Sequence, residues 1–204
     1  MLMICEGSDD PLSNPVLRPM FEARRRVFVD LMGWQLPVVG HRFEVDQFDG
    51  PDAVYLVLSD SAGGHVASAR LLKTTGPHIL GSLFPQLCAA GVPSGPGILE
   101  ITRFCLDPRQ RASERLEARN RLVTALVDHA LRSGIEAYTG VAEIGWLQQV
   151  LAFGWACRPL GLPQPVGGTL VGALRIDIDE ETPRLLAANG IHREAELASI
   201  AQAA

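Results

Sequence analysis

The sequence has no apolar run that approaches the roughly 18 to 20 residues a helix needs to cross a bilayer. Its first residues, MLMICEGSDDPLSNP, lack the basic segment of a secretory signal and turn acidic within a few positions. These absences predict a cytoplasmic protein that does not insert into a membrane.

Closely spaced metal ligands are also missing. The 4 cysteines form no C-x-x-C pair, and the 5 histidines form no H-x-x-x-H or H-E-x-x-H motif. Metal sites usually draw on closely spaced ligands, and disulfide frameworks belong mainly to small secreted chains. We therefore predict reduced, mostly buried thiols and no metal site.

The charge balance disfavours a nucleic-acid partner. The formal net charge is -5, whereas proteins that bind nucleic acids usually present a basic surface. Hydrophobic residues make up 47% of the 204 positions and charged residues 20%, which is the composition of a folded chain. This length suits one well-buried domain. We expect a single domain over residues 1–204, with a polar helical tail from about residue 180.

Arginine is nevertheless concentrated in one segment. Between Arg103 and Arg121 there are six arginines and three acidic residues. Such an excess indicates an anionic partner, although a solvated, arginine-rich helix face would have the same composition.

The hydrophobic pattern predicts a mixed sheet with helices on both faces. Helices are expected over 15–33, 113–132 and 143–153. Strands are expected over 53–58, 65–72, 98–106, 135–142, 155–160 and 169–178. A turn rich in glycine separates the first two strands, so these should form an antiparallel hairpin.

The segment 34–52 has no clear period and carries three carboxylates, Glu44, Asp46 and Asp49. Aromatic and apolar residues stand between them, which favours a loop held against the body of the protein over a solvated one. Carboxylates in a partly dry site need cations nearby, because otherwise their charged forms are disfavoured.

Three arginines can supply those cations: Arg24 on the first helix, Arg70 on the second strand and Arg103 on the third. Arginine is rarely buried unless it is paired or holds a ligand. Glu100 and Arg103 would face opposite ways in a regular strand, and a bulge would bring them to the same side. A purely structural ion-pair network is the alternative, but such networks stabilise weakly. We predict that the three carboxylates, Glu100 and the three arginines form one buried site.

These residues stand in an ordered set of motifs. R-x-x-V-F begins at Arg24 and L-M-G-W ends at Trp34, while E-x-D-x-x-D begins at Glu44. R-L-L-x-T-T-G-P-H-I-L begins at Arg70 and E-I-T-R-F at Glu100. Over roughly residues 20–106 the set resembles the signature of the acyl-homoserine lactone synthases, the LuxI-type autoinducer synthases.

The resemblance implies a fold and an activity. Members of that family are similar in fold to GCN5-related N-acetyltransferases, so we expect an α/β, single-domain α-β-α sandwich with a mixed twisted sheet. They transfer a fatty acyl group from acyl carrier protein to the amine of S-adenosylmethionine. Closure of the lactone then releases methylthioadenosine and gives a quorum-sensing signal. S-adenosylmethionine is a co-substrate, and no cofactor is implied.

The resemblance also implies roles for the residues that match. The amine must lose a proton, which requires a carboxylate or a water that it positions. Glu44 and Glu100 both fit that role, and Arg103 is the third residue expected to be catalytic. Aromatic faces suit the sulfonium or the adenine, and guanidinium groups suit the carboxylate. The residues expected to bind S-adenosylmethionine are Arg24, Phe28, Trp34, Asp46, Asp49, Arg70 and Phe84.

The acyl chain is expected to lie among residues of the second half of the chain. These are Thr139, Val141, Ala142, Trp146 and Leu151, all of which would also suit a plain hydrophobic core.

The segment before the long helix distinguishes two acyl donors. Acetyltransferases that use coenzyme A carry a loop of the form Q/R-x-x-G-x-G/A, whose N–H groups hold the pyrophosphate. Residues 107–114, DPRQRASE, have no glycine and place Glu114 at that point. We therefore expect acyl carrier protein to dock on Arg109, Arg111, Arg115 and Arg119. The alternatives are an acetyl-CoA-dependent N-acetyltransferase of the same fold and an inactive S-adenosylmethionine-binding paralogue.

Overall fold

The computed structural model describes residues 1–193, which divide into two compact units. The first unit contains residues 1–71 and 103–125, and the second contains residues 72–102 and 126–193. Three elements contribute residues to both units: β5 (His65–Lys73), β6 (Ile98–Leu106) and α3 (Ala112–Ser133). That the chain forms a single domain stays a prediction.

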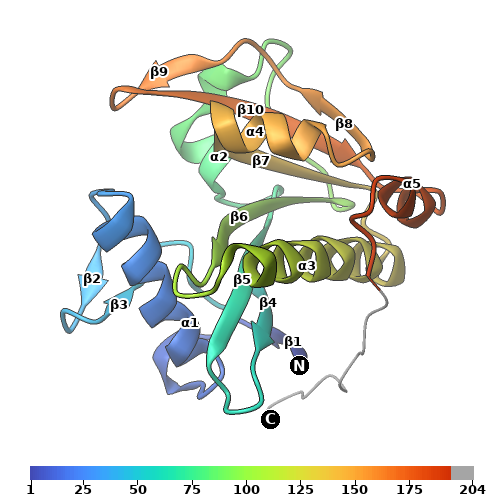
Figure 1. Ribbon diagram of the computed structural model, residues 1–204. Helices are drawn as coiled ribbons and strands as arrows, with labels where there is room; N and C mark the ends of the chain where they lie inside the picture. The colour runs from blue at the N-terminus through green and yellow to red at the C-terminus, as the bar shows by residue number, and fades with distance from the viewer. Residues whose placement is uncertain (194–204) are drawn as a thin grey trace. The chain divides into compact units, whose positions relative to one another are not determined.

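Within the first unit, β1, β4 and β5 are neighbours in that order, and each pairs antiparallel with the next (Figure 1). The hairpin of β4 (Val54–Ser59) and β5 confirms the prediction for this part of the chain. Strand β1 (Leu2–Glu6) was not predicted, although it pairs with β4 along its whole length. A second short hairpin, β2 (Val38–Val39) with β3 (Phe43–Glu44), lies inside the segment expected to be aperiodic.

The helix predicted over 15–33 forms in two parts. A 3-10 turn at Pro11–Ser13 precedes α1 (Leu17–Arg24), and α1 continues as a π-helix over Arg25–Leu31. The apolar spacing predicted one continuous α-helix and gave no sign of the change in winding. Stretches of π-helix are rare and occur frequently at functional sites.

The second unit contains a mixed sheet, as predicted. Strands β6, β7 (Ala137–Glu143), β10 (Thr169–Asp177) and β8 (Ala156–Pro159) are neighbours in that order. The short strand β9 (Gln164–Val166), which was not predicted, also pairs with β10. Of the strand pairs described within the second unit, β6 and β7 are the parallel one, and their pairing ends at Ile101↔Gly140.

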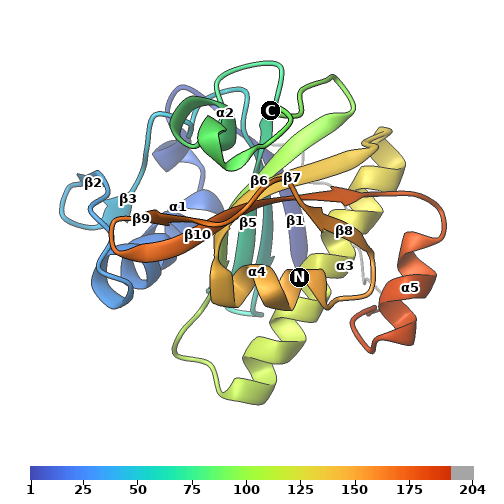
Figure 2. The same ribbon diagram turned by 90° about the horizontal axis from the view of Figure 1, so that it is seen from above.

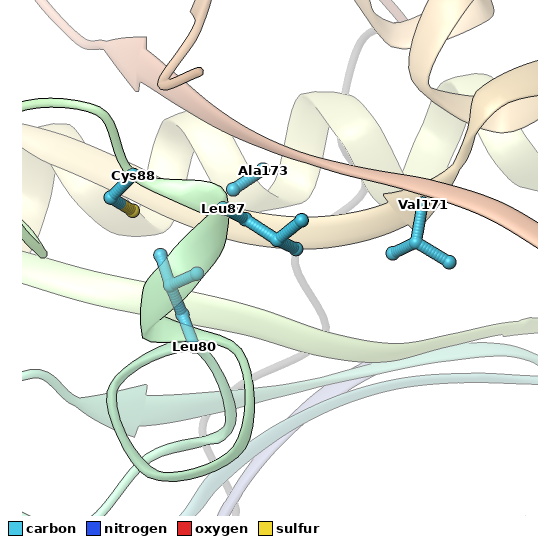
Figure 3. Packing of buried hydrophobic residues seen from close by; sticks show 5 residues of the cluster. All are labelled: Leu80, Leu87, Cys88, Val171 and Ala173. Atoms are coloured by element: carbon cyan, nitrogen blue, oxygen red, sulfur yellow. The ribbon is translucent and has the colours of Figure 1, made fainter. Parts of the chain in front are cut away.

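Helices and turns cover this sheet. Figure 2 shows α4 (Ile144–Leu151) beside β7 and β10, with which it is in contact. Helix α2 (Ile79–Leu83) and the 3-10 turn Pro85–Leu87 lie in the connection between β5 and β6. A core cluster joins these turns to β10 (Figure 3). Its buried members are Leu80, Leu87, Cys88, Val171 and Ala173.

The end of the long helix follows the expected chemistry. Helix α3 stops at Ser133, and Gly134 has a φ of +66°, the left-handed conformation typical of a residue just past a helix end. Of the predicted polar tail, α5 (Thr182–Ala188) is helical. The remainder of that prediction, residues 194–204, lies outside the described residues.

Within residues 1–193, no helix is both long and apolar enough to span a bilayer. All four cysteines are free, and three of them, Cys5, Cys88 and Cys105, are buried.

Candidate active site

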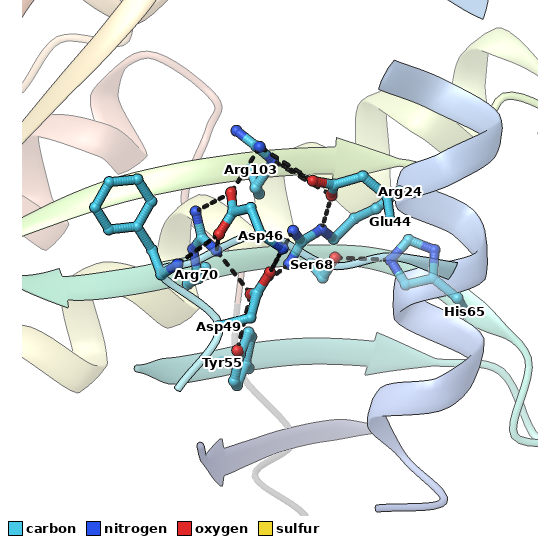
Figure 4. A network of polar contacts seen from close by, with 10 residues as sticks. Arg24, Glu44, Asp46, Asp49, Tyr55, His65, Ser68, Arg70 and Arg103 are labelled. Atoms are coloured by element: carbon cyan, nitrogen blue, oxygen red, sulfur yellow. Dashed lines mark hydrogen bonds and ion pairs between the residues drawn. The ribbon is translucent and has the colours of Figure 1, made fainter. Parts of the chain in front are cut away.

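Six of the seven predicted charged residues form one closed ring of alternating charges in the first unit (Figure 4). Each guanidinium contacts two carboxylates, and each carboxylate contacts two guanidinium groups. The ring runs through Arg24, Glu44, Arg103, Asp46, Arg70, Asp49 and back to Arg24. The prediction of pairing is confirmed for all six, and that of burial for Arg24, Glu44, Asp49 and Arg70, whereas Asp46 and Arg103 are partly buried.

Arg24 is fully buried, with 1% of its surface exposed. Its Nε donates to Glu44 Oε2 at 2.5 Å, and its two Nη atoms donate to the two oxygens of Asp49 at 2.8 Å. Burial alone would raise the pKa of Asp49, but Arg24 and Arg70 beside it hold that pKa well below its usual range. Asp49 is therefore an anion at any pH at which the protein works.

Arg70 and Arg103 complete the ring. Arg70 donates to both oxygens of Asp46 at 2.6 and 3.1 Å and lies 2.7 Å from Asp49. Arg103 Nη2 donates to Glu44 at 3.0 Å and to Asp46 at 2.7 Å.

The backbone at Arg103 departs from a regular strand. Its φ is +49°, in the left-handed region that L-residues other than glycine seldom adopt. The sequence predicted that Glu100 and Arg103 could lie on the same side of the strand only if a bulge interrupted it. The observed φ has a conformational cost of about 1–3 kcal/mol that the two carboxylate contacts of Arg103 offset. That Glu100 and Arg103 share a side stays a prediction.

Tyr55 is a member of the site that the sequence did not predict. Its hydroxyl donates to Asp49 Oδ1 at 2.9 Å, and it stands opposite Arg70 in the β4–β5 register. Burial, together with the charge of Asp49, raises the pKa of Tyr55. In the sequence this residue looks like an ordinary apolar strand position, and only the pairing register relates it to Arg70.

Two predicted aromatic residues come together next to the ring. Phe28 and Trp34 are stacked, with ring centroids 5.1 Å apart and an interplanar angle of 19°. The guanidinium carbon of Arg103 lies 5.6 Å from the centroid of Phe28. Phe28 is buried, whereas Trp34 is partly exposed.

Glu100 belongs to the second unit and is fully buried. Its two carboxylate oxygens accept the backbone N–H groups of Ile79 and Leu80, at 2.7 and 2.8 Å. The start of α2 thus fixes the orientation of this carboxylate. That Glu100 shares one site with the ring stays a prediction.

His78, the residue before α2, was not predicted as part of the site. Its Nδ1 lies 2.8 Å from the carbonyl oxygen of Gly76, so Nδ1 carries the proton. Its Nε2 is buried and has no hydrogen-bond partner among the described residues. The ring also packs on Gly81, where a Cβ would lie only 2.5 Å from the His78 ring. Gly81 is therefore needed for this close approach beside the Glu100 contact.

The predicted acyl-chain residues are all in the second unit. Thr139 is fully buried, and its hydroxyl has no hydrogen-bond partner among the described residues. Val141 and Phe84 pack against the core cluster of Figure 3. Phe84 was expected to bind S-adenosylmethionine, but it packs against the same cluster as Val141, which was expected to line the acyl-chain site. Its role stays a prediction.

The other three acyl-chain residues show ordinary packing or partial exposure. Trp146 meets Phe153 edge to face with ring centroids 5.9 Å apart, which suits a core position. Ala142 and Leu151 are partly exposed. That these residues bind the acyl chain stays a prediction.

The four arginines predicted for docking differ in their contacts. Arg109 and Arg111 pair with nearby acids, Asp107 and Glu114, each at 2.7 Å. Arg119 donates to the side-chain oxygen of Asn120 at 3.0 and 2.8 Å. Arg115 is exposed and makes no side-chain ion pair within the described part of the chain.

His65, the first residue of β5, is a buried titratable group, and it should make stability depend on pH. Its Nε2 contacts Ser68 Oγ at 2.8 Å, and burial lowers its pKa to about 4. The folded state therefore binds fewer protons than the unfolded state, and stability falls as pH drops from about 6.5 to 4. Urea unfolding between pH 7 and pH 4.5 should show a loss of about 2 kcal/mol.

The matched variant is His65→Gln, which should flatten that pH dependence. The comparison is best made in a His129→Gln background, since burial also lowers the pKa of His129. Equal pH dependence with and without His65 would show that another group is responsible.

Comparison with known proteins identifies the family. The autoinducer synthase family model matches residues 10–186. An acyl-homoserine-lactone synthase of Ralstonia nicotianae is 36% identical over 166 residues, which are 78% of this chain and 80% of that protein. The structure of BjaI, a CoA-dependent acyl-homoserine lactone synthase with SAM and isopentyl-CoA, matches with a TM-score of 0.82 and 28% identity. The match covers 98% of this chain and 95% of BjaI.

Two further structures bear on the ligands and the fold. TofI in a ternary complex with an inhibitor and MTA matches with a TM-score of 0.77 and 30% identity, over 92% of this chain and 96% of TofI. An acyl-CoA N-acyltransferase from Pseudomonas aeruginosa is 16% identical with a TM-score of 0.59, over 86% of this chain and 99% of that one. This likeness concerns the fold alone and, with BjaI, confirms the predicted α/β fold. The chain therefore belongs to the autoinducer synthase family and is an acyltransferase of the acyl-homoserine-lactone synthase type.

Proposed function

We propose that the protein transfers a fatty acyl group from acyl carrier protein to S-adenosylmethionine and closes the product to an acyl-homoserine lactone. The observation that carries this proposal is the closed charge ring with the stacked Phe28 and Trp34 beside it. All of these residues lie in motifs that the sequence shares with the family.

S-adenosylmethionine would bind through the ring and the aromatic pair. Its carboxylate suits a guanidinium, and its sulfonium and adenine suit the faces of Phe28 and Trp34. The ring has three guanidinium groups and three carboxylates, so its formal charges cancel. It would therefore orient the substrate through locally placed charges rather than attract it by a net negative charge. BjaI and TofI support this ligand class, since their structures hold SAM and MTA.

The reaction needs one proton acceptor. The substrate amine loses a proton and attacks the thioester carbonyl, and the carrier leaves as a thiol. The substrate carboxylate then attacks the carbon next to the sulfonium, which forms the lactone and releases neutral methylthioadenosine. Both oxygens of Glu44 already accept from guanidinium groups. The oxygens of Glu100 also accept hydrogen bonds, but from the neutral backbone N–H groups of Ile79 and Leu80 rather than from two cations. For this reason we assign proton transfer to Glu100, directly or through a water, and assign to Glu44 the positioning of Arg103.

The beginning of α3 favours a carrier protein over coenzyme A. The Glu114 carboxylate accepts the backbone N–H of Arg111 at 2.9 Å, in the manner of a capping box. A negative group thus already occupies the helix end at which a pyrophosphate would bind. The single phosphate of a carrier-bound arm avoids most of that repulsion.

The free cysteines support action in the cytoplasm. Four thiols without a disulfide are typical of a reducing compartment, which also supplies both proposed substrates.

The test is a direct comparison of donors. Purified protein is incubated with S-adenosylmethionine and a series of acyl chains, each offered on acyl carrier protein and on coenzyme A. Acyl-homoserine lactone and methylthioadenosine are measured by mass spectrometry. We expect kcat/KM for the best chain to be at least about tenfold higher on the carrier protein.

Each other outcome has a distinct meaning. Lactone formed only from acyl-CoA would overturn the proposed donor and leave the synthase activity in place. Binding of S-adenosylmethionine without turnover on any donor would indicate an inactive paralogue.

A further inference from the structure

The first three turns of α3 present two different exposed faces within the first unit. Ala112, Arg115, Leu116 and Arg119 have the i, i+3, i+4, i+7 spacing of one helix face. The other face borders a cavity of about 320 Å³. Its lining consists of Val66, Gln110, Ser113, Glu114, Glu117, Ala118 and Arg121. One face is thus basic and apolar, and the other carries the acidic residues.

Leu116 stands out on the basic face because half of its surface, 50%, is exposed. A single exposed leucine is common on protein surfaces and needs no explanation by itself. Here, however, it lies between two arginines on the same helix face. An apolar centre with a charged rim is the general anatomy of a protein–protein contact.

The two flanking arginines differ from the other two in the predicted docking group. Arg109 and Arg111 each lie beside an acid of their own segment, which offsets their charge locally. Arg115 is exposed and makes no side-chain ion pair within the described part of the chain, while the partly exposed Arg119 donates to the side-chain oxygen of Asn120. The positive charge that this helix face presents to a partner therefore lies next to Leu116, on Arg115 and Arg119.

We propose that acyl carrier protein docks on this face, with Leu116 as the apolar centre and with Arg115 and Arg119 as the basic rim. This inference rests on the proposed function, because it takes the carrier protein as the donor. Carrier proteins present carboxylates around a few apolar side chains, which complements this pattern in both charge and hydrophobicity. A small contact of this kind suits a partner that must leave after each turnover.

The test compares a carrier-bound donor with a carrier-free one. Leu116→Gln removes the apolar centre without adding charge, and Arg115→Glu reverses one rim charge. We expect each to lower kcat/KM for acyl carrier protein about tenfold, mainly through KM. With the same acyl chain on pantetheine, kcat/KM should stay within about twofold of wild type, as should KM for S-adenosylmethionine.

Leu131→Gln is the matched control, because Leu131 is a second exposed leucine of α3, with 39% of its surface exposed. It should leave both donors unaffected. Unchanged carrier kinetics in Leu116→Gln and Arg115→Glu would overturn the docking face, as would an equal loss with both donors. Failure of the proposed function looks different, since wild-type protein would then give no lactone from the carrier-bound donor. That result would also remove this inference.

Discussion

Replacement of Arg24 by alanine is expected to lower the free energy of unfolding by about 3–5 kcal/mol. Arg24 supplies one contact to Glu44 and a bidentate pair to Asp49, and both carboxylate side chains are 0% exposed. Without the guanidinium, two buried carboxylates each lose a partner and cannot be rehydrated at low cost. The loss should appear as a lower urea midpoint with an unchanged dependence on urea concentration.

Tyr55→Phe is the control for this experiment. It removes one neutral donor from Asp49 and leaves the ion pairs in place, so we expect a loss of only about 1 kcal/mol. A variant Arg24→Ala that unfolds within about 1 kcal/mol of wild type would mean that water replaces the guanidinium readily. The ring would then be a solvated surface network rather than a buried one.

Replacement of Glu100 by glutamine is expected to lower kcat by about 10²–10⁴-fold. The charge that accepts the proton, or positions the water that does, is lost. The amide also presents an NH₂ group to one of the two backbone N–H donors, Ile79 or Leu80, so that one contact becomes a donor facing a donor. We therefore also expect a loss of stability of about 1–3 kcal/mol.

Kinetics and stability must be measured on the same sample to separate these two effects. Assays well below the melting temperature, together with a binding measurement for S-adenosylmethionine, show whether the folded fraction is intact. Gly81→Ala is a useful comparison, because it disturbs the start of α2 through His78 while the Glu100 carboxylate remains. Turnover like that of wild type in Glu100→Gln would remove this residue from proton transfer and return the role to Glu44.

The parts of the fold that the sequence predicted are those governed by local pattern. Strand β6 has the predicted bounds, and α3 begins and ends within one residue of its prediction, because periodicity and a terminal glycine are local signals. Strand β1 was missed because five residues carry little pattern and its partner lies more than 50 residues away, as in Leu2↔Leu58. The π-helical turn was missed because its apolar spacing also fits an α-helix.

For the site, residue type predicted burial and pairing but not the partners. Arginine on a strand indicated a buried ion pair at Arg70, and the structure confirms it. That Arg24 bridges Glu44 and Asp49 depends on how the chain between residues 24 and 49 folds back, which no local pattern encodes. Tyr55 was missed because its hydroxyl acquires a role only through the neighbouring Asp49 carboxylate in the folded chain.

The closed ring has a consequence for how these positions can change during evolution. Each of its six side chains contacts two partners of opposite sign, so any single replacement by a neutral residue leaves the charges of the ring unbalanced. Removing one arginine together with one carboxylate restores the balance but still leaves the ring open at two ends. A series of single substitutions that removes these charges one at a time therefore passes through proteins in which the charges of the ring are unbalanced. The six positions are therefore expected to be inherited as a block, and to vary only where the whole site has been abandoned.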